Sequence, residues 1–206
     1  MKPISCFILS AGFLLLALTI PMSSIAQKGN GEVGTEKPAL LVIDIQNAFL
    51  NYIPEDDRAF AIKIINHTIS TFDQHHLPVI KVHHSDPTWG PVPGTEPFEF
   101  PESVIQAENE IHLVKHYHSA FQQTSLDSIL QANGCNTLYL CGLSATGCVL
   151  ATYFGANERN YPAMMIREGI MSPDRGYTKM VNDICESVSF MTMTRMLQQS
   201  KSAGSY

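Results

Sequence analysis

The stretch that decides the fold is Leu138-Tyr139-Leu140-Cys141-Gly142-Leu143-Ser144-Ala145-Thr146-Gly147-Cys148-Val149. Its first four residues are apolar enough for a buried strand, and the small residues after them form a turn that leads Cys148 into a helical run over 149–157. Such a unit leaves backbone N–H groups unpaired at the start of the helix, where they favour negative charge. We therefore expect a stabilised thiolate at Cys148, with N–H groups available for an oxyanion. The alternative is a buried, inert cysteine.

Outside this stretch, strands and helices alternate along the chain. A continuous apolar run predicts a buried strand at 39–43, and further short strands are expected at 78–82, 111–114 and 163–166. Helical spacing or capping residues predict helices at 58–72, 124–133 and 177–198. This order predicts an α/β fold of the Rossmann type, with three layers (α/β/α) around a central, mostly parallel sheet. The segment 84–101 is rich in proline and glycine, and we expect it to be an ordered loop or lid.

Composition sets the class of protein and excludes one class of partner. The chain has 206 residues, of which 45% are hydrophobic and 16% charged, as in a globular domain and unlike a disordered chain. The formal net charge is −6, so no nucleic-acid partner is expected.

The first 26 residues have the pattern of a secretory signal peptide. Lys2 gives a basic start, an apolar run spans 7–20, and Ser24-Ile25-Ala26 offers small residues before a cleavage site. The run is shorter than the roughly 20 residues of a transmembrane helix, although an uncleaved anchor is the alternative. We expect a signal peptide (1–26), a flexible lead-in (27–37) and one folded domain (38–206). The mature protein would be periplasmic or secreted, with no membrane contact.

Export places the remaining cysteines in an oxidising compartment. Four cysteines in the mature chain are too few for a disulfide scaffold. We interpret Cys135, Cys141 and Cys185 as structural residues, which leaves Cys148 as the candidate nucleophile.

Three reactive side chains follow predicted strands. Asp44 follows the strand 39–43, Lys115 follows the strand 111–114, and Cys148 follows the strand 138–141. The carboxyl ends of parallel strands lie at one edge of a sheet, where ligands bind. An acid, a base and a thiol gathered at this edge form a workable site for acyl transfer.

Three motifs in this order resemble those of the isochorismatase-like cysteine hydrolases. They are Ala39-Leu40-Leu41-Val42-Ile43-Asp44-Ile45-Gln46-Asn47-Ala48-Phe49, Lys115-His116-Tyr117-His118-Ser119-Ala120-Phe121, and Cys141 to Val149. The resemblance runs from about residue 38 to 198. It implies an isochorismatase-like fold and a catalytic triad of Asp44, Lys115 and Cys148. It also implies a non-proline cis peptide at Leu143–Ser144, an oxyanion hole formed by the backbone N–H groups of Ser144 and Cys148, and a homo-oligomer.

The histidines after the second strand bear on metal binding. Nicotinamidases of this family hold a metal with an Asp-x-His motif and a further histidine, whereas this chain has His83-His84-Ser85-Asp86. We expect no metal and no cofactor. The alternative is that His83, His84 and Asp86 are ligands, since imidazole suits Zn²⁺.

The resemblance implies cysteine-dependent hydrolysis of a small amide or ureide through a thioester. Candidates for the walls of the substrate pocket are the aromatic residues Phe49, Trp89, Phe98 and Tyr153, each of which can equally be core. Two other functions stay open. One is the C–O (vinyl ether) hydrolysis of the isochorismatase branch, which does not need the cysteine. The other is an exported binding protein with a vestigial site.

The signal peptide leads to a first prediction. Protein isolated from its native host should begin at Gln27, because Ala26 completes the small-residue cleavage motif. N-terminal sequencing or mass spectrometry of the soluble fraction measures this. A soluble protein that still begins at Met1 would contradict the prediction.

Overall fold

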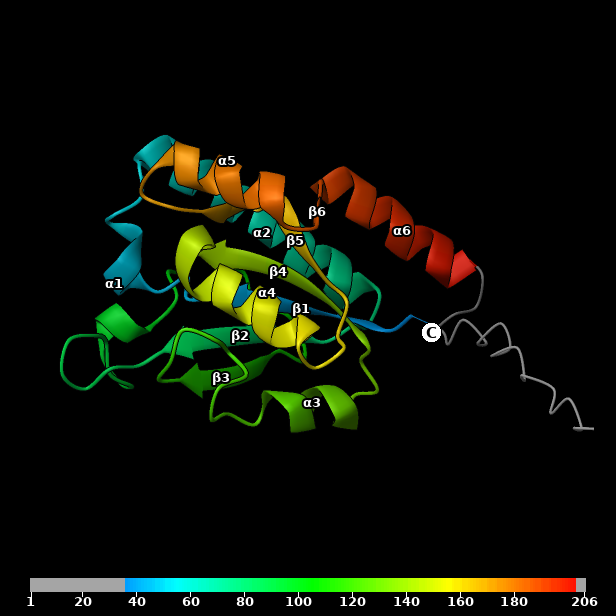
Figure 1. The fold of residues 1–206 in the computed structure, drawn as a ribbon, viewed down its shortest axis with the longest axis horizontal. Helices are drawn as coiled ribbons and strands as arrows, with labels where there is room; N and C mark the ends of the chain where they lie inside the picture. The colour runs from blue at the N-terminus through cyan, green and yellow to red at the C-terminus, as the bar shows by residue number, and fades with distance from the viewer. Residues whose placement is uncertain (1–35, 203–206) are drawn as a thin grey trace, which may run out of the picture. The chain divides into compact units, whose positions relative to one another are not determined.

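A parallel sheet forms the centre of the computed structural model, which describes residues 36–202 (Figure 1). In these residues six strands form one sheet with the order β3-β2-β1-β4-β5-β6, and every neighbouring pair is parallel. The strands are β1 (Pro38–Ile43), β2 (Val79–His84), β3 (Ile111–Lys115), β4 (Thr137–Leu143), β5 (Ala163–Met171) and β6 (Ser187–Val188). The predicted signal peptide and nearly all of the predicted lead-in lie outside the described residues.

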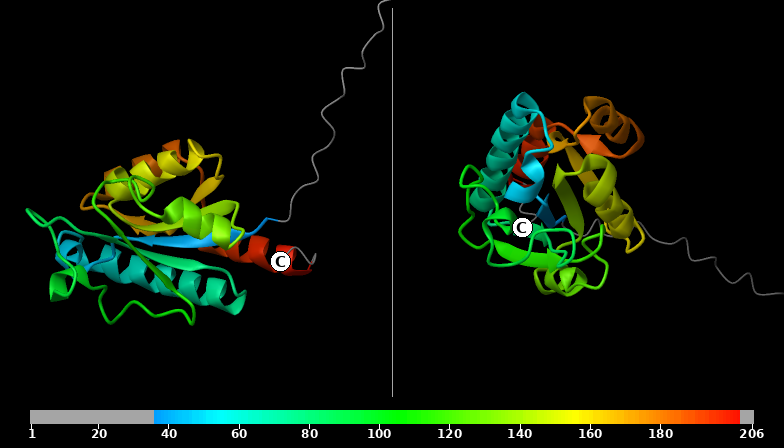
Figure 2. Two further views of the ribbon diagram at one scale, coloured as in Figure 1. Left: turned by 90° about the horizontal axis from the view of Figure 1, so that it is seen from below. Right: turned by 90° about the vertical axis from the view of Figure 1, so that its left-hand side faces the viewer.

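Helices cover both faces of the sheet (Figure 2). They are α1 (Asn47–Leu50), α2 (Glu55–Gln74), α3 (Leu126–Ala132), α4 (Leu150–Asn157), α5 (Arg175–Ile184) and α6 (Phe190–Ser202), with a short 3-10 helix, η1 (Glu96–Phe98), and a π-helical turn, η2 (Ala145–Val149). One core lies between the sheet and α1, α2 and α6. The other lies between the sheet and α3, α4 and α5. Within the described residues, no helix is both long and apolar enough to span a membrane.

The expected three-layer α/β/α architecture is confirmed, but the predicted final helix over 177–198 is wrong. The chain forms α5, leaves the helix at Cys185, adds the two-residue strand β6 and then forms α6. Ser187 and Val188 pair with Met165 and Ile166 at the edge of the sheet. Strand β5 offers unpaired backbone groups there, and pairing with them outweighs continuation of the helix.

A close backbone contact joins β1 and β4 directly below the carboxyl edge of the sheet. Gly142 pairs with Ile43 and has a φ of +122°, a conformation that side chains disfavour. A Cβ at this position would clash with the carbonyl oxygen of Ile43 and lie 2.7 Å from its nitrogen. Glycine therefore lets β4 approach the last residue of β1, which precedes Asp44.

This contact predicts a large loss of stability in Gly142→Ala. We expect the free energy of unfolding to fall by about 2–5 kcal/mol, because the left-handed conformation costs about 1–2 kcal/mol and the overpacking about 1–3 kcal/mol. Urea denaturation measures the loss. Gly94→Ala is the matched control, since Gly94 has a φ of +83° but an added Cβ there would meet no atom within 4 Å. It should lose only about 1–2 kcal/mol, and equal losses in the two variants would contradict the clash.

Candidate active site

A buried ion pair lies at the carboxyl edge of the sheet. Asp44 follows β1 with a φ of +54°, and Lys115 is the last residue of β3. The Lys115 Nζ donates to the Asp44 Oδ2 at 2.7 Å, and both side chains are almost fully buried. Because β2 lies between β1 and β3, the long lysine side chain has to reach past the end of β2. The structure thus brings together two of the three predicted catalytic residues.

Cys148 completes the group from η2, the turn between β4 and α4. It interacts electrostatically with both Asp44 and Lys115. Burial, and then the negative charge of Asp44, raise the pKa of the Cys148 thiol to about 12. The stabilised thiolate expected at Cys148 is therefore not the resting form of this residue. At neutral pH the resting cysteine is a thiol, and a base has to take its proton.

Asp44 is placed to be that base. Burial raises the pKa of the Asp44 carboxyl, although the positive charge of Lys115 acts in the opposite direction. A raised pKa makes the carboxylate a stronger proton acceptor. Its second oxygen, Oδ1, is buried and accepts no hydrogen bond of normal geometry from the described part of the chain. Asp44 therefore has one oxygen held by Lys115 and one open to a proton.

The turn before Cys148 has the backbone geometry that the family resemblance implies. The peptide bond Leu143–Ser144 is cis, as expected. The Ser144 carbonyl oxygen accepts from the N–H groups of Gly147 (2.9 Å) and Val149 (3.2 Å), which fixes the turn. The Ser144 hydroxyl lies 3.3 Å from that of Ser172, which directly follows β5. That the N–H groups of Ser144 and Cys148 form an oxyanion hole remains a prediction.

Two further residues surround the ion pair: Gln46, which the sequence did not single out, and His84, which it indicated only as an alternative metal ligand. Gln46 is fully buried, donates from Nε2 to the carbonyl oxygens of His84 (3.0 Å) and Phe98 (2.8 Å), and accepts from the His84 N–H at 2.7 Å. It therefore ties the segment after β1 to the end of β2 and to η1. The His84 Nδ1 lies 3.4 Å from the Lys115 Nζ. In the sequence, the only indication of this role for Gln46 is its position two residues after Asp44.

Two of the four aromatic candidates border a cavity near the ion pair. Phe49 and Trp89 line a cavity of about 310 Å³, together with Tyr52, Pro91 and Pro97 among others. The Phe49 ring lies 6.2 Å from the ring of His84, which contacts Lys115. Asp44, Lys115 and Cys148 do not line this cavity, so its use by a substrate remains a prediction.

The other two aromatic candidates are core residues, so the structure does not support them as pocket walls. Phe98 is buried and stacks on His83 with ring centroids 4.9 Å apart. Tyr153 packs in the core beneath α4, and its hydroxyl accepts from the Glu186 N–H at 3.1 Å. A sequence cannot distinguish a buried aromatic residue in the core from one that lines a pocket.

The three alternative metal ligands are held apart. His83 and His84 are adjacent in β2, so their side chains point to opposite faces of the sheet. The His83 Nε2 lies 3.1 Å from the His112 Nδ1, and Asp86 accepts from the N–H groups of Thr88 and Trp89. Among the described residues, no group of three or more His, Cys, Asp or Glu side chains is arranged to hold a metal ion. A metal-free reaction remains a prediction.

The other cysteines differ from Cys148 in their surroundings. All four cysteines of the described residues are free; Cys135 and Cys141 are buried, and Cys185 is half-buried. Burial raises the pKa of the thiol in each of these three. Asp44 acts on the titration of Cys148 and on none of the others, which agrees with the assignment of Cys148 as the nucleophile candidate.

Known proteins share this fold and sequence pattern. Residues 38–192 match the family model of the isochorismatase domain. The isochorismatase family protein YddQ of Bacillus subtilis is 34% identical over 144 residues, which cover 63% of this chain and 75% of that protein. A maleamate amidohydrolase of Pseudomonas putida is 38% identical over 69 residues, which cover 34% of this chain and 32% of that protein. The structure of N-carbamoylsarcosine amidase from Thermoplasma acidophilum has a TM-score of 0.66 at 29% identity and covers 75% of this chain and 96% of that one.

The buried ion pair predicts a non-additive pattern of stability. Asp44→Asn and Lys115→Met should each lower the free energy of unfolding by about 3 kcal/mol or more, because each leaves a buried charge unpaired. The double variant should recover most of this loss, since it removes both charges. Urea denaturation of the four proteins measures the cycle.

A surface pair provides the control for this cycle. Lys179 and Asp183 form an ion pair whose side chains are 76% and 58% exposed. Lys179→Met and Asp183→Asn should each cost less than about 1 kcal/mol. Additive losses in the Asp44–Lys115 double variant would contradict the description of this pair as buried and mutually compensating.

Proposed function

The chain belongs to the isochorismatase family of hydrolases, and from this premise we propose that it cleaves the C–N bond of a small amide or ureide through a thioester on Cys148. One observation carries the proposal. The Lys115 ammonium donates to the buried carboxylate of Asp44, and the charge of that carboxylate acts directly on the Cys148 thiol. A thiol beside a base that is oriented by a third group is the arrangement of nucleophilic catalysis.

The reaction starts with a proton transfer inside the site. The Cys148 thiol passes its proton to the free oxygen of Asp44, and the thiolate attacks the substrate carbonyl carbon. The carbonyl oxygen becomes an oxyanion, which the backbone N–H groups of Ser144 and Cys148 stabilise. As the tetrahedral intermediate collapses, the C–N bond breaks and the departing nitrogen takes the proton from Asp44.

Hydrolysis of the thioester returns the enzyme to its starting state. Asp44, again a carboxylate, accepts a proton from a water molecule, whose oxygen attacks the thioester carbonyl. The C–S bond then breaks, the acid product leaves, and the proton on Asp44 returns to the Cys148 sulfur. Lys115 keeps its proton throughout and stabilises negative charge on Asp44 and on the thiolate.

Two relatives support an amide as the substrate class. The maleamate amidohydrolase and the N-carbamoylsarcosine amidase are named for hydrolysis of C–N bonds in small carbonyl compounds. Vinyl ether hydrolysis, for which the family is named, is the second candidate. Its chemistry does not require a cysteine, so a Cys148 variant distinguishes the two.

We propose further that the enzyme works outside the cytoplasm, as a periplasmic or secreted protein. The support is the N-terminal pattern of a basic residue, an apolar run and small residues before Gln27.

The proposal predicts the activities of three variants in an ammonia-release assay. The assay uses a panel of small amides and ureides that includes maleamate and N-carbamoylsarcosine. Cys148→Ala and Asp44→Asn should each lower kcat/KM by at least about 10³-fold, since each removes a member of a unit that acts together. Cys185→Ala removes a half-buried thiol away from Asp44 and should keep near wild-type activity. Activity retained by Cys148→Ala would overturn the thioester mechanism.

The pH dependence of kcat/KM follows from the same groups. Activity requires the Asp44 carboxylate, and burial raises the pKa of Asp44. Activity should therefore fall on acidification with an apparent pKa above the ordinary value of about 3.9. A pH–rate profile measures this limb. An acid limb at or below pH 3.9 would contradict Asp44 as the buried base.

A further inference from the structure

His84, the last residue of β2, is a half-buried neighbour of the buried ion pair. Its Nδ1 lies 3.4 Å from the Lys115 Nζ. Lys115 and Asp44 are 0% and 2% exposed, whereas His84 is partly exposed. Of these three residues, His84 is therefore the one that a molecule in solution can contact.

The ammonium group of Lys115 determines which ring nitrogen of His84 carries hydrogen. An ammonium group has donors only, so the Nδ1 atom that faces it must be the nitrogen that accepts. Burial, and then the positive charge of Lys115, lower the pKa of His84, so the ring is neutral at neutral pH. A neutral imidazole carries one hydrogen, which in His84 therefore lies on Nε2.

The Nε2–H group of His84 is an unused donor. It has no hydrogen-bond acceptor among residues 36–202. Asp86, whose charge acts on His84, accepts instead from the N–H groups of Thr88 and Trp89. Gln46 holds the His84 backbone at both its N–H group and its carbonyl oxygen. The two ring nitrogens lie on opposite sides of the imidazole, so a donor held in this way is directed away from the ion pair.

The order of the strands separates this donor from the predicted oxyanion hole. Ser144 and Cys148 follow β4, Asp44 follows β1, and His84 ends β2, with β1 between β2 and β4. Neighbouring strands lie about 4.8 Å apart, so the ends of β2 and β4 are about 10 Å apart. A donor on His84 therefore meets a different part of a substrate from the carbonyl group that reacts at Cys148.

We propose that His84 is a specificity-determining residue, whose Nε2–H donates a hydrogen bond to a second oxygen of the substrate. The inference rests on the proposed function, since it takes the reacting carbonyl to lie at Cys148. It narrows the substrate class to small amides or ureides with a carbonyl or carboxylate oxygen a few bonds from the C–N bond that breaks. A fixed donor discriminates against the analogue without this oxygen, because the donor is then left unpaired.

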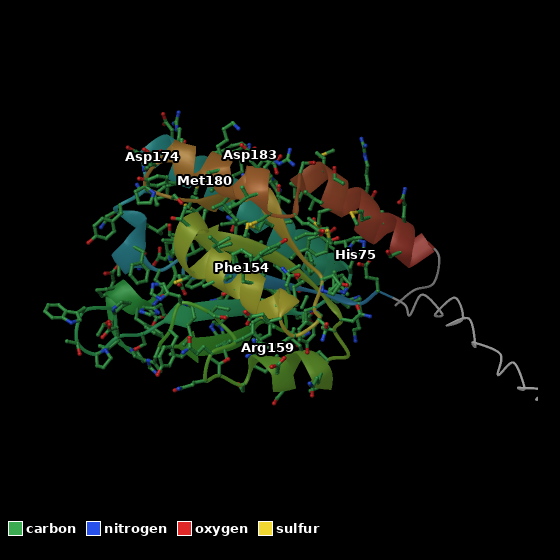
Figure 3. All side chains as sticks on the ribbon, in the orientation of Figure 1. His75, Phe154, Arg159, Asp174, Met180 and Asp183 are labelled. Carbon is green, nitrogen blue, oxygen red and sulfur yellow. The ribbon has the colours of Figure 1, made fainter. Side chains whose placement is uncertain are left out.

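Nitrogen-15 NMR of the histidine rings in the full chain tests the tautomer without any substrate. At about pH 7.5, where an ordinary histidine is mostly neutral, His84 should carry its hydrogen on Nε2. His75 is the internal control, because its Nδ1 lies 2.8 Å from the Thr71 carbonyl oxygen, which can only accept, and should carry the hydrogen. His75 lies far from α1 along the long axis of the molecule (Figure 3). A hydrogen on the Nδ1 of His84 would overturn the proposal.

Calorimetric titration of the Cys148→Ala chain measures the specificity, because this variant can bind an amide without forming a thioester. Three amides of matched shape differ only at the fourth carbon atom. Succinamate carries a carboxylate there, 4-oxopentanamide a ketone, and 4-methylpentanamide no oxygen. Succinamate or 4-oxopentanamide should bind at least about tenfold more tightly than 4-methylpentanamide. A preference for succinamate alone identifies a carboxylate as the acceptor, and a preference for both identifies any carbonyl oxygen.

Two substitutions in the Cys148→Ala chain separate the roles of the two ring nitrogens. His84→Asn places an amide near the position of Nδ1 and has no donor at that of Nε2, so the preference should fall to within about twofold. His84→Gln reaches the position of Nε2 with an amide N–H and should keep a preference of at least about fivefold. His75→Asn is the matched control and should leave the preference unchanged.

An oxygen preference that survives in the His84→Asn chain would overturn the proposal. So would a Cys148→Ala chain that binds neither succinamate nor 4-oxopentanamide up to about 10 mM, a limit weaker than that of ordinary substrate binding. Failure of the proposed reaction is a separate result. A preference that depends on His84, in a chain whose wild type releases no ammonia from any amide, would keep His84 as a binding residue and contradict the thioester mechanism.

Discussion

The buried ion pair between Lys115 and Asp44 is the constraint on which the site depends. Moving two charges out of water costs several kcal/mol per ion, and a contact at 2.7 Å offsets this cost only when the geometry is held. A hydrophobic pair of similar volume would often be as stable. The ion pair is therefore better explained by the proposed reaction than by a contribution to the stability of the fold. The surrounding structure has to hold both side chains in place.

The sheet and its edge provide this support. The two charged residues come from β1 and β3, which are separated by β2, so the end of β2 must lie in register with both. Gln46 fixes that end through its two hydrogen bonds with the His84 backbone. On the other side, Gly142 allows β4 to approach Ile43, the residue before Asp44. Without a side chain at position 142, the strand that leads to Cys148 can lie close to the carboxylate.

The sequence predicted the layers, the five long strands and the edge of the sheet at which Asp44, Lys115 and Cys148 lie, because local patterns show where each strand ends; the catalytic roles of the three residues remain a prediction. Apolar runs locate buried strands, and parallel strands place Asp44, Lys115 and Cys148 at one edge. The predictions that were wrong concern properties that depend on the three-dimensional surroundings of a residue, which no local sequence pattern encodes. The pKa of Cys148 follows from its burial and from a carboxylate about 100 positions away in sequence. Likewise, the helix predicted over 177–198 is interrupted because Ser187 and Val188 pair with the edge of β5. Phe98 and Tyr153 differ from Phe49 only in their position in the folded chain, since the first two are buried in the core and Phe49 lines a cavity.

The raised pKa of Cys148 changes how the site stabilises its nucleophile. A cysteine that was a thiolate at rest beside an ionised Asp44 would place two negative charges against one lysine in a buried space. The structure instead pairs a thiol with a carboxylate and an ammonium, so the three groups sum to zero charge. When the proton moves from Cys148 to Asp44 the sum stays zero, and no net charge has to be buried in the step that creates the nucleophile. In the proposed reaction, negative charge moves from the carboxylate to the sulfur and then to the substrate oxygen, while Lys115 remains the fixed counter-charge. In the proposed reaction, a small proton displacement between two buried groups therefore supplies the thiolate that is not present at rest.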